Sequence, residues 1–248
     1  MIMLSWEKLP DELKTEEVRG YYDVLRKKRI SLFFKRAFDI FASLILLVVL
    51  SPVFLVLAIA IKIDSRGPVF YRQVRVTQYG KTFRIHKFRS MVQDADKGSQ
   101  VTVSNDARIT RVGAFVRKCR LDEICQLIDV LVGNMTFVGT RPEVPKYVEK
   151  YSEEMMATLL LPAGITSEAS IYYKDEAQLL DEAEDTDKTY IENVLPAKMY
   201  YNLKSIEKFG FWRDIKIMFM TVFAMLGKEY KGDYVAVKAE EKERETVQ

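Results

Sequence analysis

The hydrophobic pattern of this chain is dominated by one apolar run, residues 40 to 61, which contains no charged side chain. As a helix, a run of this length is long enough to cross about 30 Å of hydrocarbon. Ser51-Pro52 stands midway, and a proline removes a backbone donor and clashes with the carbonyl four residues earlier. The sequence therefore predicts a kink or break there, with the Ser51 hydroxyl hydrogen-bonded to a backbone group that the break frees.

Basic residues flank this run at both ends, which bears on how it would meet a membrane. They include Arg26, Lys27, Lys28, Arg29, Lys35 and Arg36 before the run, and Lys62, Arg66, Arg72 and Arg75 after it. Positive residues orient a membrane helix through an asymmetry between its ends, and here both ends favour the same side. We therefore favour a re-entrant helix over one that crosses. A core helix of a soluble protein is a third alternative; a secretory signal peptide is disfavoured because the run is too long and no cleavage site follows.

The segments next to the apolar run have weaker but readable patterns. Residues 1 to 34 form an amphipathic lead-in, which either lies at a membrane interface or is a partly ordered terminus. Residues 69 to 76 and 82 to 88 are two extended runs around a short loop, which predicts a β-hairpin. Arg72 and Arg84 alternate with apolar positions in these runs, so the hairpin should have one basic face.

The second half of the chain has mostly helical spacing. It predicts one helix over 108–131 that is capped at Gly133, a short strand over 136–138, a rigid loop over 139–145, and helices over 146–161, 175–183 and 187–207, the last interrupted near Pro196. Residues 211 to 226 are too short and too charged to span a membrane, and are typical of an interfacial amphipathic helix or a core helix. The charged tail, residues 231 to 248, is predicted to be disordered. The pattern as a whole indicates an α+β fold, mainly helical, with one β-hairpin.

Composition adds the placement of charge to this picture. The net charge is only +3, but basic residues crowd into about 26 to 120 and acidic residues into about 149 to 192. A basic region beside a membrane segment suits anionic headgroups or phosphorylated ligands, and it would also suit nucleic acid. With His86 as the one histidine, and Cys119 and Cys125 six residues apart, a metal site built from histidine and cysteine is disfavoured.

Candidate chemistry centres on Asp122-Glu123, which lies among basic residues and directly before an apolar stripe. A carboxylate at a helix N-terminus near arginines is stabilised as the anion, and an anionic carboxylate can attack phosphorus. A structural salt bridge at the start of a helix is the alternative. Lys87 and Arg89 on the hairpin could contact a diphosphate or form a solvated edge, and Arg141-Pro142 fixes an arginine in a stiff loop, as a binding site needs.

Several ordered motifs together resemble a known family. KRAFDI, LSPVF, GPVFYRQVRV, GKTFRIHKFRSM, NDARITRVGAFVRKCRLDEICQLIDVLVGNMTFVGTRPE and PAGIT, between about residues 35 and 225, resemble the bacterial sugar transferases, which are monotopic phosphoglycosyl transferases. The resemblance implies transfer of a phosphosugar from a UDP-sugar to polyprenol (undecaprenyl) phosphate with release of UMP. It also implies Mg²⁺ as cofactor and a place at the first membrane step of surface polysaccharide assembly.

The resemblance also implies roles for individual residues. Ser51-Pro52 falls on the break of the family's re-entrant membrane helix. Asp122 falls on the nucleophile that forms a covalent phosphosugar intermediate, and Glu123 on its acidic partner, so that both are the expected Mg²⁺ ligands. Arg141-Pro142 falls on the nucleotide-binding loop. We assign four further basic residues to substrate binding, with diphosphate contact as our own inference for the first two: Lys87, Arg89, Arg111 and Arg120.

The chain departs from the family pattern in three places. Ile124-Cys125-Gln126 stands where members commonly have Leu-Pro-Gln, which should alter only packing. Thr140 replaces a proline before Arg141, which predicts a looser nucleotide loop. Pro162-Ala163-Gly164 replaces the more usual Pro-Gly in a region that could tune the choice of sugar.

These inferences divide the chain into the lead-in (1–34), the re-entrant helix (35–64), a cytoplasmic catalytic domain at the membrane interface (65–230) and the tail (231–248). The expected location is the inner membrane of a bacterium, with membrane lipids as partners and homo-oligomers left open. Two other classes of function remain as alternatives. One is a non-catalytic membrane scaffold for glycan-assembly enzymes. The other, a nucleic-acid binder, is disfavoured because an aromatic stacking platform is lacking and the second half is acidic.

Overall fold

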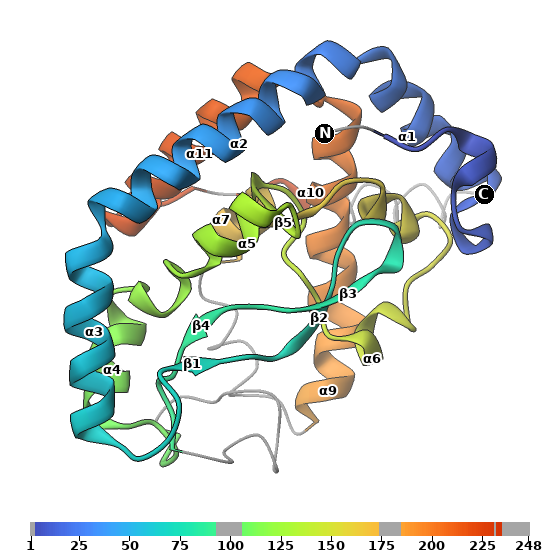
Figure 1. The fold of residues 1–248 in the computed structure, drawn as a ribbon. Helices are drawn as coiled ribbons and strands as arrows, with labels where there is room; N and C mark the ends of the chain where they lie inside the picture. Colours follow the sequence, from blue (N-terminus) through green and yellow to red (C-terminus); the bar gives the residue numbers. More distant parts are fainter. Residues whose placement is uncertain (1–2, 93–105, 174–184, 231, 235–248) are drawn as a thin grey trace.

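The computed structural model describes residues 3–92, 106–173, 185–230 and 232–234, which form a mainly helical α+β fold (Figure 1). The helix predicted over 175–183 and most of the predicted tail lie outside these residues. The α-helices are α1 (Glu16–Lys27), α2 (Arg29–Val49), α3 (Ser51–Asp64), α4 (Arg111–Lys118), α5 (Gln126–Val132), α6 (Pro145–Val148), α7 (Glu168–Tyr172), α9 (Thr186–Thr189), α10 (Leu195–Glu207) and α11 (Phe211–Met225). The 3-10 turns are η1 (Trp6–Lys8), η2 (Asp11–Leu13), η3 (Gln78–Gly80), η5 (Leu121–Glu123) and η6 (Met155–Leu160), and η7 (Tyr190–Val194) is a π-helical turn.

The apolar run forms two helices, α2 and α3, which are bent by 60° at their junction. The predicted break is therefore confirmed. The Ser51 hydroxyl donates a hydrogen bond to the carbonyl of Val48 at 2.7 Å. That carbonyl would otherwise accept from the N–H of residue 52, which Pro52 lacks. In the part of the chain that the structure describes, no single helix is long and apolar enough to span a membrane, but α2 and α3 meet that criterion together as a bent pair.

The outer faces of α2 and α3 are apolar and exposed, and α11 runs beside α2 along the same edge of the molecule (Figure 1). The exposed apolar side chains include Phe33, Phe34, Phe41, Leu44, Val48 and Val49 of α2, Leu55, Val56, Ile59 and Ile63 of α3, and Trp212, Phe219, Val222 and Met225 of α11. Phe41 is 67% exposed and Val56 is 65% exposed. The alternative of a helix buried in a soluble core is therefore wrong.

The strands form three two-stranded pairs. Antiparallel pairing joins β1 (Phe70–Tyr71) to β4 (Lys87–Phe88) and β2 (Val74–Val76) to β3 (Thr82–Arg84), which confirms the predicted hairpin. A parallel pair, β5 (Met135–Val138) with β6 (Ala163–Thr166), is added to it. The pattern predicts β5 but not β6, because a four-residue strand that contains Gly164 carries little strand signal.

The lead-in packs into the core of the molecule. Val18, Tyr22 and Leu25 of α1 are buried, together with Leu9 and Leu13 before it. They share one hydrophobic cluster with residues of η6 and α10. The apolar sides of η2 and α1 therefore cover the domain core, whereas Ile30, Phe33 and Phe34 at the end of the predicted lead-in are exposed on α2.

The predicted helix over 108–131 is wrong as a continuous element. It is divided into α4, η5 and α5, because Arg120 adopts a left-handed conformation with φ 55°. The predicted cap at Gly133 is confirmed, with φ 95°. The predicted helix over 146–161 is also divided, into α6 and η6. The predicted interruption of the helix over 187–207 near Pro196 is confirmed, because the π-helical turn η7 separates α9 from α10, whose first turn contains Pro196.

Polar side chains on α2 attach this helix to the rest of the fold. The ammonium group of Lys35 donates to the carbonyl of Val138 at 2.7 Å and pairs with Asp214 of α11 at 2.5 Å. Asp39 accepts a hydrogen bond from the Thr136 hydroxyl at 2.7 Å. Arg36 donates to carbonyl groups at the end of α5. These contacts hold α2 against α5, β5 and α11, so the apolar helix pair has a fixed place on the domain.

Candidate active site

The Asp122-Glu123 pair lies in the η5 turn, where side chains from two other elements meet it. Lys87 comes from β4 and its ammonium group lies 3.3 Å from the carboxylate of Glu123. Arg141 comes from the loop after β5 and donates two hydrogen bonds to the same carboxylate, one of them at 3.2 Å. Three segments far apart in the sequence therefore converge on Glu123.

Local structure fixes the place of each of these side chains. α4 starts at Thr110, whose hydroxyl caps it by accepting from the N–H of Gly113. The left-handed turn at Arg120 then redirects the chain into η5. On the hairpin, His86 donates its backbone N–H to the buried carboxylate of Asp129 at 2.8 Å, and its ring Nδ1 lies 2.9 Å from the same carboxylate. This contact ties the hairpin to α5 and so sets the distance between Lys87 and Glu123.

The two acidic residues have opposite electrostatic environments. Burial acts to raise the pKa of Glu123, but Arg141 and Lys87 outweigh it and hold that pKa well below its usual range. Burial and the neighbouring charge of Glu123 raise the pKa of Asp122, against the opposing effect of Lys87 and Arg117. The expected stabilisation of the Asp122 anion by neighbouring basic residues is present, from Lys87 and Arg117, but burial and Glu123 outweigh it.

Asp122 is half-buried, and no side chain within the described residues donates a hydrogen bond to it. A carboxylate that is partly shielded from water and not held by side-chain donors is a stronger nucleophile than one locked in a salt bridge. The alternative of a purely structural ion pair thus applies to Glu123 and not to Asp122.

The loop that carries Arg141 is anchored on both sides. The carbonyl of Thr140 accepts from the N–H of Gly164 at 2.8 Å, and the carbonyl of Pro142 accepts from the Arg75 guanidinium at 3.0 Å. Glu143 follows and is buried, with the Tyr190 hydroxyl 2.5 Å from its carboxylate. The sequence reasoning missed Arg75 and Glu143 as supports of the site. Only their positions in the sequence could have indicated this role: Arg75 lies in the first strand run of the hairpin, and Glu143 directly follows Arg141-Pro142.

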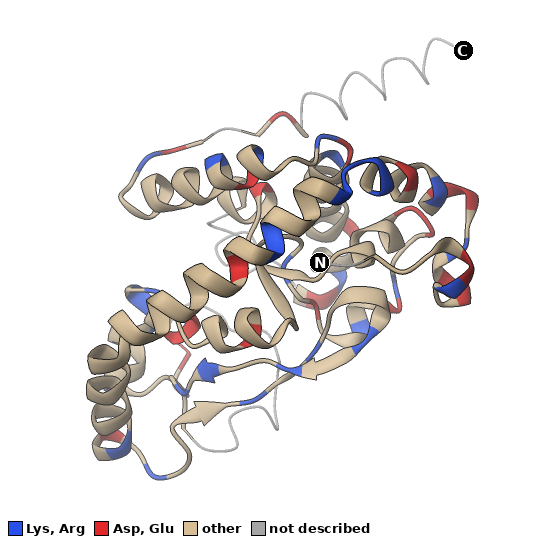
Figure 2. Cartoon of the chain, turned by 45° about the horizontal axis from the view of Figure 1, so that its top comes forward, with Lys and Arg blue, Asp and Glu red and all other residues tan. Residues whose placement is uncertain are grey.

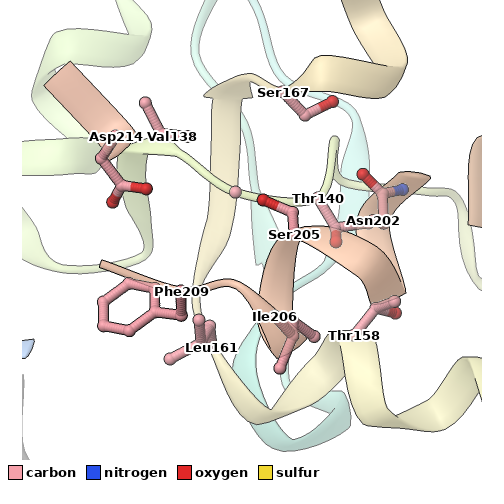
Figure 3. Close-up of a pocket in the computed structure, with 11 residues that line it drawn as sticks. Val138, Thr140, Thr158, Leu161, Ser167, Asn202, Ser205, Ile206, Phe209 and Asp214 are labelled. Carbon is pink, nitrogen blue, oxygen red and sulfur yellow. The ribbon is translucent and has the colours of Figure 1, made fainter. Parts of the chain in front are cut away.

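A small cavity lies behind this loop, at the end of β5 (Figure 3). Its lining includes polar groups of Thr140, Thr158, Ser167, Asn202 and Ser205. The cavity volume is about 30 Å³. A single water fits such a space, but sites for small-molecule ligands are roughly ten times larger. The cavity is therefore a packing space behind the loop and is too small for a sugar.

The remaining predicted site residues are placed less directly. Arg120 is exposed and close enough to Glu123 to contribute to its lowered pKa. Arg111 is exposed at the first residue of α4, and its side chain has no hydrogen bond or ion pair to another described residue. Arg89 is buried and turned toward Ser65, whose carbonyl and hydroxyl groups accept from it at 2.7 and 2.8 Å. Of the four predicted binding residues, the structure brings Lys87 and Arg120 to the acidic pair.

The chain's own supply of metal ligands at the site is limited. Among the described residues, no group of three or more His, Cys, Asp or Glu side chains comes together as a metal site. Mg²⁺ is commonly held by one or two carboxylates together with substrate phosphates and water. Asp122 and Glu123 fit Mg²⁺ in that way, as a site completed by a phosphorylated ligand.

Comparison with known proteins identifies the family of this chain. Residues 30–228 match the sequence family described as bacterial sugar transferase. The chain is 38% identical over 220 residues to a UDP-glucose:undecaprenyl-phosphate glucose-1-phosphate transferase of Klebsiella pneumoniae, covering 85% of this chain and 44% of the relative. It is 36% identical over 198 residues to a UDP-N-acetylgalactosamine-undecaprenyl-phosphate N-acetylgalactosaminephosphotransferase of Aeromonas hydrophila, covering 78% and 44%.

A third relative, an undecaprenyl-phosphate galactose phosphotransferase of Salmonella typhimurium, is 32% identical over 218 residues, covering 82% of this chain and 42% of the relative. The chain therefore spans less than half the length of these relatives, and their names give three different sugars. The match nevertheless covers most of this chain and includes the η5 turn, the hairpin and the Arg141 loop. The chain belongs to the bacterial sugar transferase family.

Proposed function

We propose that this protein is a phosphoglycosyl transferase that moves a phosphosugar from a UDP-sugar to undecaprenyl phosphate and releases UMP. The observation that carries the proposal is the pair of unlike carboxylates: Asp122 without a side-chain donor, next to Glu123 held by Lys87 and Arg141. The names of the relatives, which describe this class of reaction with undecaprenyl phosphate, support the same reading.

The reaction takes place in two displacements at phosphorus. In the first, a carboxylate oxygen of Asp122 attacks the phosphorus bonded to the sugar, and the bond from that phosphorus to the oxygen of UMP breaks. UMP leaves, and the phosphosugar is joined to the Asp122 carboxylate as an acyl phosphate. In the second, a phosphate oxygen of undecaprenyl phosphate attacks the same phosphorus. The bond to Asp122 breaks, the carboxylate is regenerated and the lipid carries the phosphosugar.

Basic side chains orient the donor and stabilise its charge. Arg141 presents a planar guanidinium from an anchored loop, which suits two-point contact with a phosphate. Lys87 is half-buried beside the acidic pair, where a positive charge acts strongly on charge that develops in the transition state. Both cations pair with Glu123 in this structure, so binding of a diphosphate requires them to share or exchange this partner.

Mg²⁺, when bound between the acidic pair and the diphosphate, would offset negative charge on the phosphates. Glu123 is the carboxylate suited to hold such an ion near the diphosphate, because its pKa is held low and it stays ionised. Asp122 can then keep one oxygen directed at phosphorus.

The exposed apolar faces of α2, α3 and α11 support a place at a membrane. We propose that α2 and α3 enter the cytoplasmic leaflet of the inner membrane as a re-entrant pair, with the Ser51-Pro52 junction deepest. The hydrogen bonds of Lys35, Arg36 and Asp39, which attach α2 to the domain, would then keep the acidic pair near the headgroups, where the phosphate of a polyprenol lies.

The test is a covalent-adduct experiment on the full chain. Wild-type protein in detergent is incubated with UDP-glucose, UDP-galactose or UDP-N-acetylgalactosamine without lipid acceptor, and its intact mass is measured. We expect one donor to add the mass of a phosphosugar, and Asp122→Asn to abolish both the adduct and UMP release with undecaprenyl phosphate. Asp11→Asn, whose exposed carboxylate pairs with Lys14 in the lead-in, is the matched control and should retain both.

An Asp122→Asn protein that still forms the adduct would remove this residue from the chemistry. A wild-type protein that releases no UMP with any donor, while remaining folded and membrane-bound, would favour the scaffold alternative.

A further inference from the structure

The corner between α1 and α2 carries a basic hollow that the proposed reaction does not use. It is an open hollow of about 420 Å³, and the residues that line it are Asp23, Arg26, Lys27 and Arg29. Figure 2 shows basic positions gathered at this corner, at the opposite end of α2 from its junction with α3. The hollow is thus separate from the acidic pair, which lies in η5.

The cations of this corner are not neutralised by the protein. Arg26, Lys27, Lys28 and Arg29 are all exposed, and none of them forms an ion pair with another residue in the described ranges. The one carboxylate in the lining, Asp23, is paired with Arg19 at 3.3 Å. Glu7 is near enough to Arg26 to feel its charge, but it is fully exposed to solvent. The corner therefore presents a net positive charge to an outside partner.

The hollow adjoins the exposed apolar face of α2. Ile30, Phe33 and Phe34 occupy the next turn and are 75%, 65% and 54% exposed. A cationic hollow that borders an apolar face matches a phospholipid, whose phosphate lies above its acyl chains. A soluble phosphate ligand or a nucleic acid would satisfy the charge but would leave the aromatic side chains in water.

We propose that this corner is a binding site for the headgroups of anionic phospholipids, with Arg26, Lys27 and Arg29 at the phosphate and the first turns of α2 at the acyl chains. The inference rests on the proposed membrane placement, and it adds the class of lipid and the residues that select it. The lipid would fix the corner end of α2 at the surface while the Ser51-Pro52 end lies in the apolar layer.

Vesicle flotation of the purified full chain tests this site. Vesicles of phosphatidylcholine alone are compared with vesicles that also contain phosphatidylglycerol, for the wild type and for the triple variant Arg26→Gln/Lys27→Gln/Arg29→Gln. Each basic residue near an anionic surface contributes roughly 1 kcal/mol, so losing three should weaken partitioning to the anionic vesicles on the order of 100-fold. Binding to the neutral vesicles should not change.

The matched control removes the same charge elsewhere. Lys81→Gln/Lys150→Gln/Lys188→Gln alters three exposed lysines outside α1, α2, α3 and α11, and it should keep the preference for anionic vesicles. A corner variant that retains that preference would overturn the inference, as would a corner variant that loses binding to an oligonucleotide but not to vesicles. Absence of binding to every vesicle would overturn the membrane placement as well, whereas the adduct experiment would still test the chemistry.

Discussion

Asp122 and Glu123 are neighbours in the sequence, yet their side chains differ in every contact that matters for chemistry. Glu123 has two basic partners, and its pKa is lowered. Asp122 accepts from no side chain of the described ranges, and its pKa is raised by burial and by Glu123. One carboxylate is fixed and charged while the other is available, which is how a pair of identical functional groups can take two roles.

The first prediction concerns the pH dependence of Asp122. In the proposed mechanism its anion is the nucleophile, so activity should fall as pH falls through its raised pKa. Lys87 stabilises that anion, and Lys87→Met should therefore raise the pKa of Asp122 further and move the acid limb of kcat/KM to higher pH. Because Lys87 is also proposed to stabilise the charge of the diphosphate, kcat/KM should drop on the order of 100-fold. The measurement is a pH profile of UMP release under kcat/KM conditions.

Lys118→Met is the control for this profile. Lys118 is exposed in the last turn of α4 and is not among the charges that shift the pKa of Asp122. Its acid limb should coincide with that of the wild type. An acid limb that stays in place in Lys87→Met would show that the group titrating in the rate is not Asp122.

The elements differ in how far the sequence could predict them, and the reason is where the determining interaction lies. Pro52 breaks the apolar run through its own backbone chemistry, so the α2 and α3 junction could be predicted from one residue. The hairpin could likewise be predicted from its own residues, because two extended runs flank a short loop. The break at Arg120 could not be predicted, because its apolar stripe continues at helical spacing through η5 and an arginine carries no signal for a left-handed conformation.

The site could be predicted only in part, because some of its contacts depend on local sequence and others on long-range packing. Asp122, Glu123 and Lys87 lie in motifs that a sequence displays, but the pairing of Glu123 with Arg141 depends on the parallel contact of β5 with β6. The contacts by which Arg75 and Glu143 support the Arg141 loop depend on the same long-range packing. Arg89 lies in the same motif as Lys87, yet packing turns it toward Ser65 at the end of α3.

The second prediction tests the bent pair of helices as one element. Single cysteines at Lys28 and Arg66, in a background with Cys119 and Cys125 changed to serine, should both react with an impermeant maleimide from the cytoplasmic side. Pro52→Ala restores an N–H for the carbonyl of Val48, so a fraction of the chains should straighten and place the Arg66 cysteine on the far side. Labelling in spheroplasts and inverted vesicles measures both.

Pro145→Ala is the matched proline change, since Pro145 begins α6 outside the bent pair. It should leave the labelling unchanged. Lys28 and Arg66 cysteines on opposite sides in the parent protein would contradict re-entry and would favour a helix pair that crosses.

In the whole molecule, the parts join through two kinds of contact. Buried polar groups fix α2 to the domain, as Lys35 does with Val138 and Asp214. Apolar packing fixes the lead-in, whose residues precede the region that matches the family. The lead-in covers a core surface formed by η6 and α10. These two elements also line the small cavity behind the Arg141 loop. A change in the packing of the lead-in should therefore lower the free energy of unfolding without changing the rate of UMP release.

The third prediction follows from that separation. Leu25 is fully buried in the cluster that joins α1 to η6 and α10, so Leu25→Ala should cost about 2–5 kcal/mol of unfolding free energy. Lys27→Ala, on the exposed side of the same helix, should change it by less than about 0.5 kcal/mol. Denaturant unfolding in detergent measures both, and UMP release per folded molecule should equal that of the wild type. If Leu25→Ala leaves the unfolding midpoint unchanged, α1 is not part of the cooperative core. If it instead lowers turnover in fully folded protein, the lead-in acts on the site itself, and the cavity behind the Arg141 loop is the path through which that effect would have to pass.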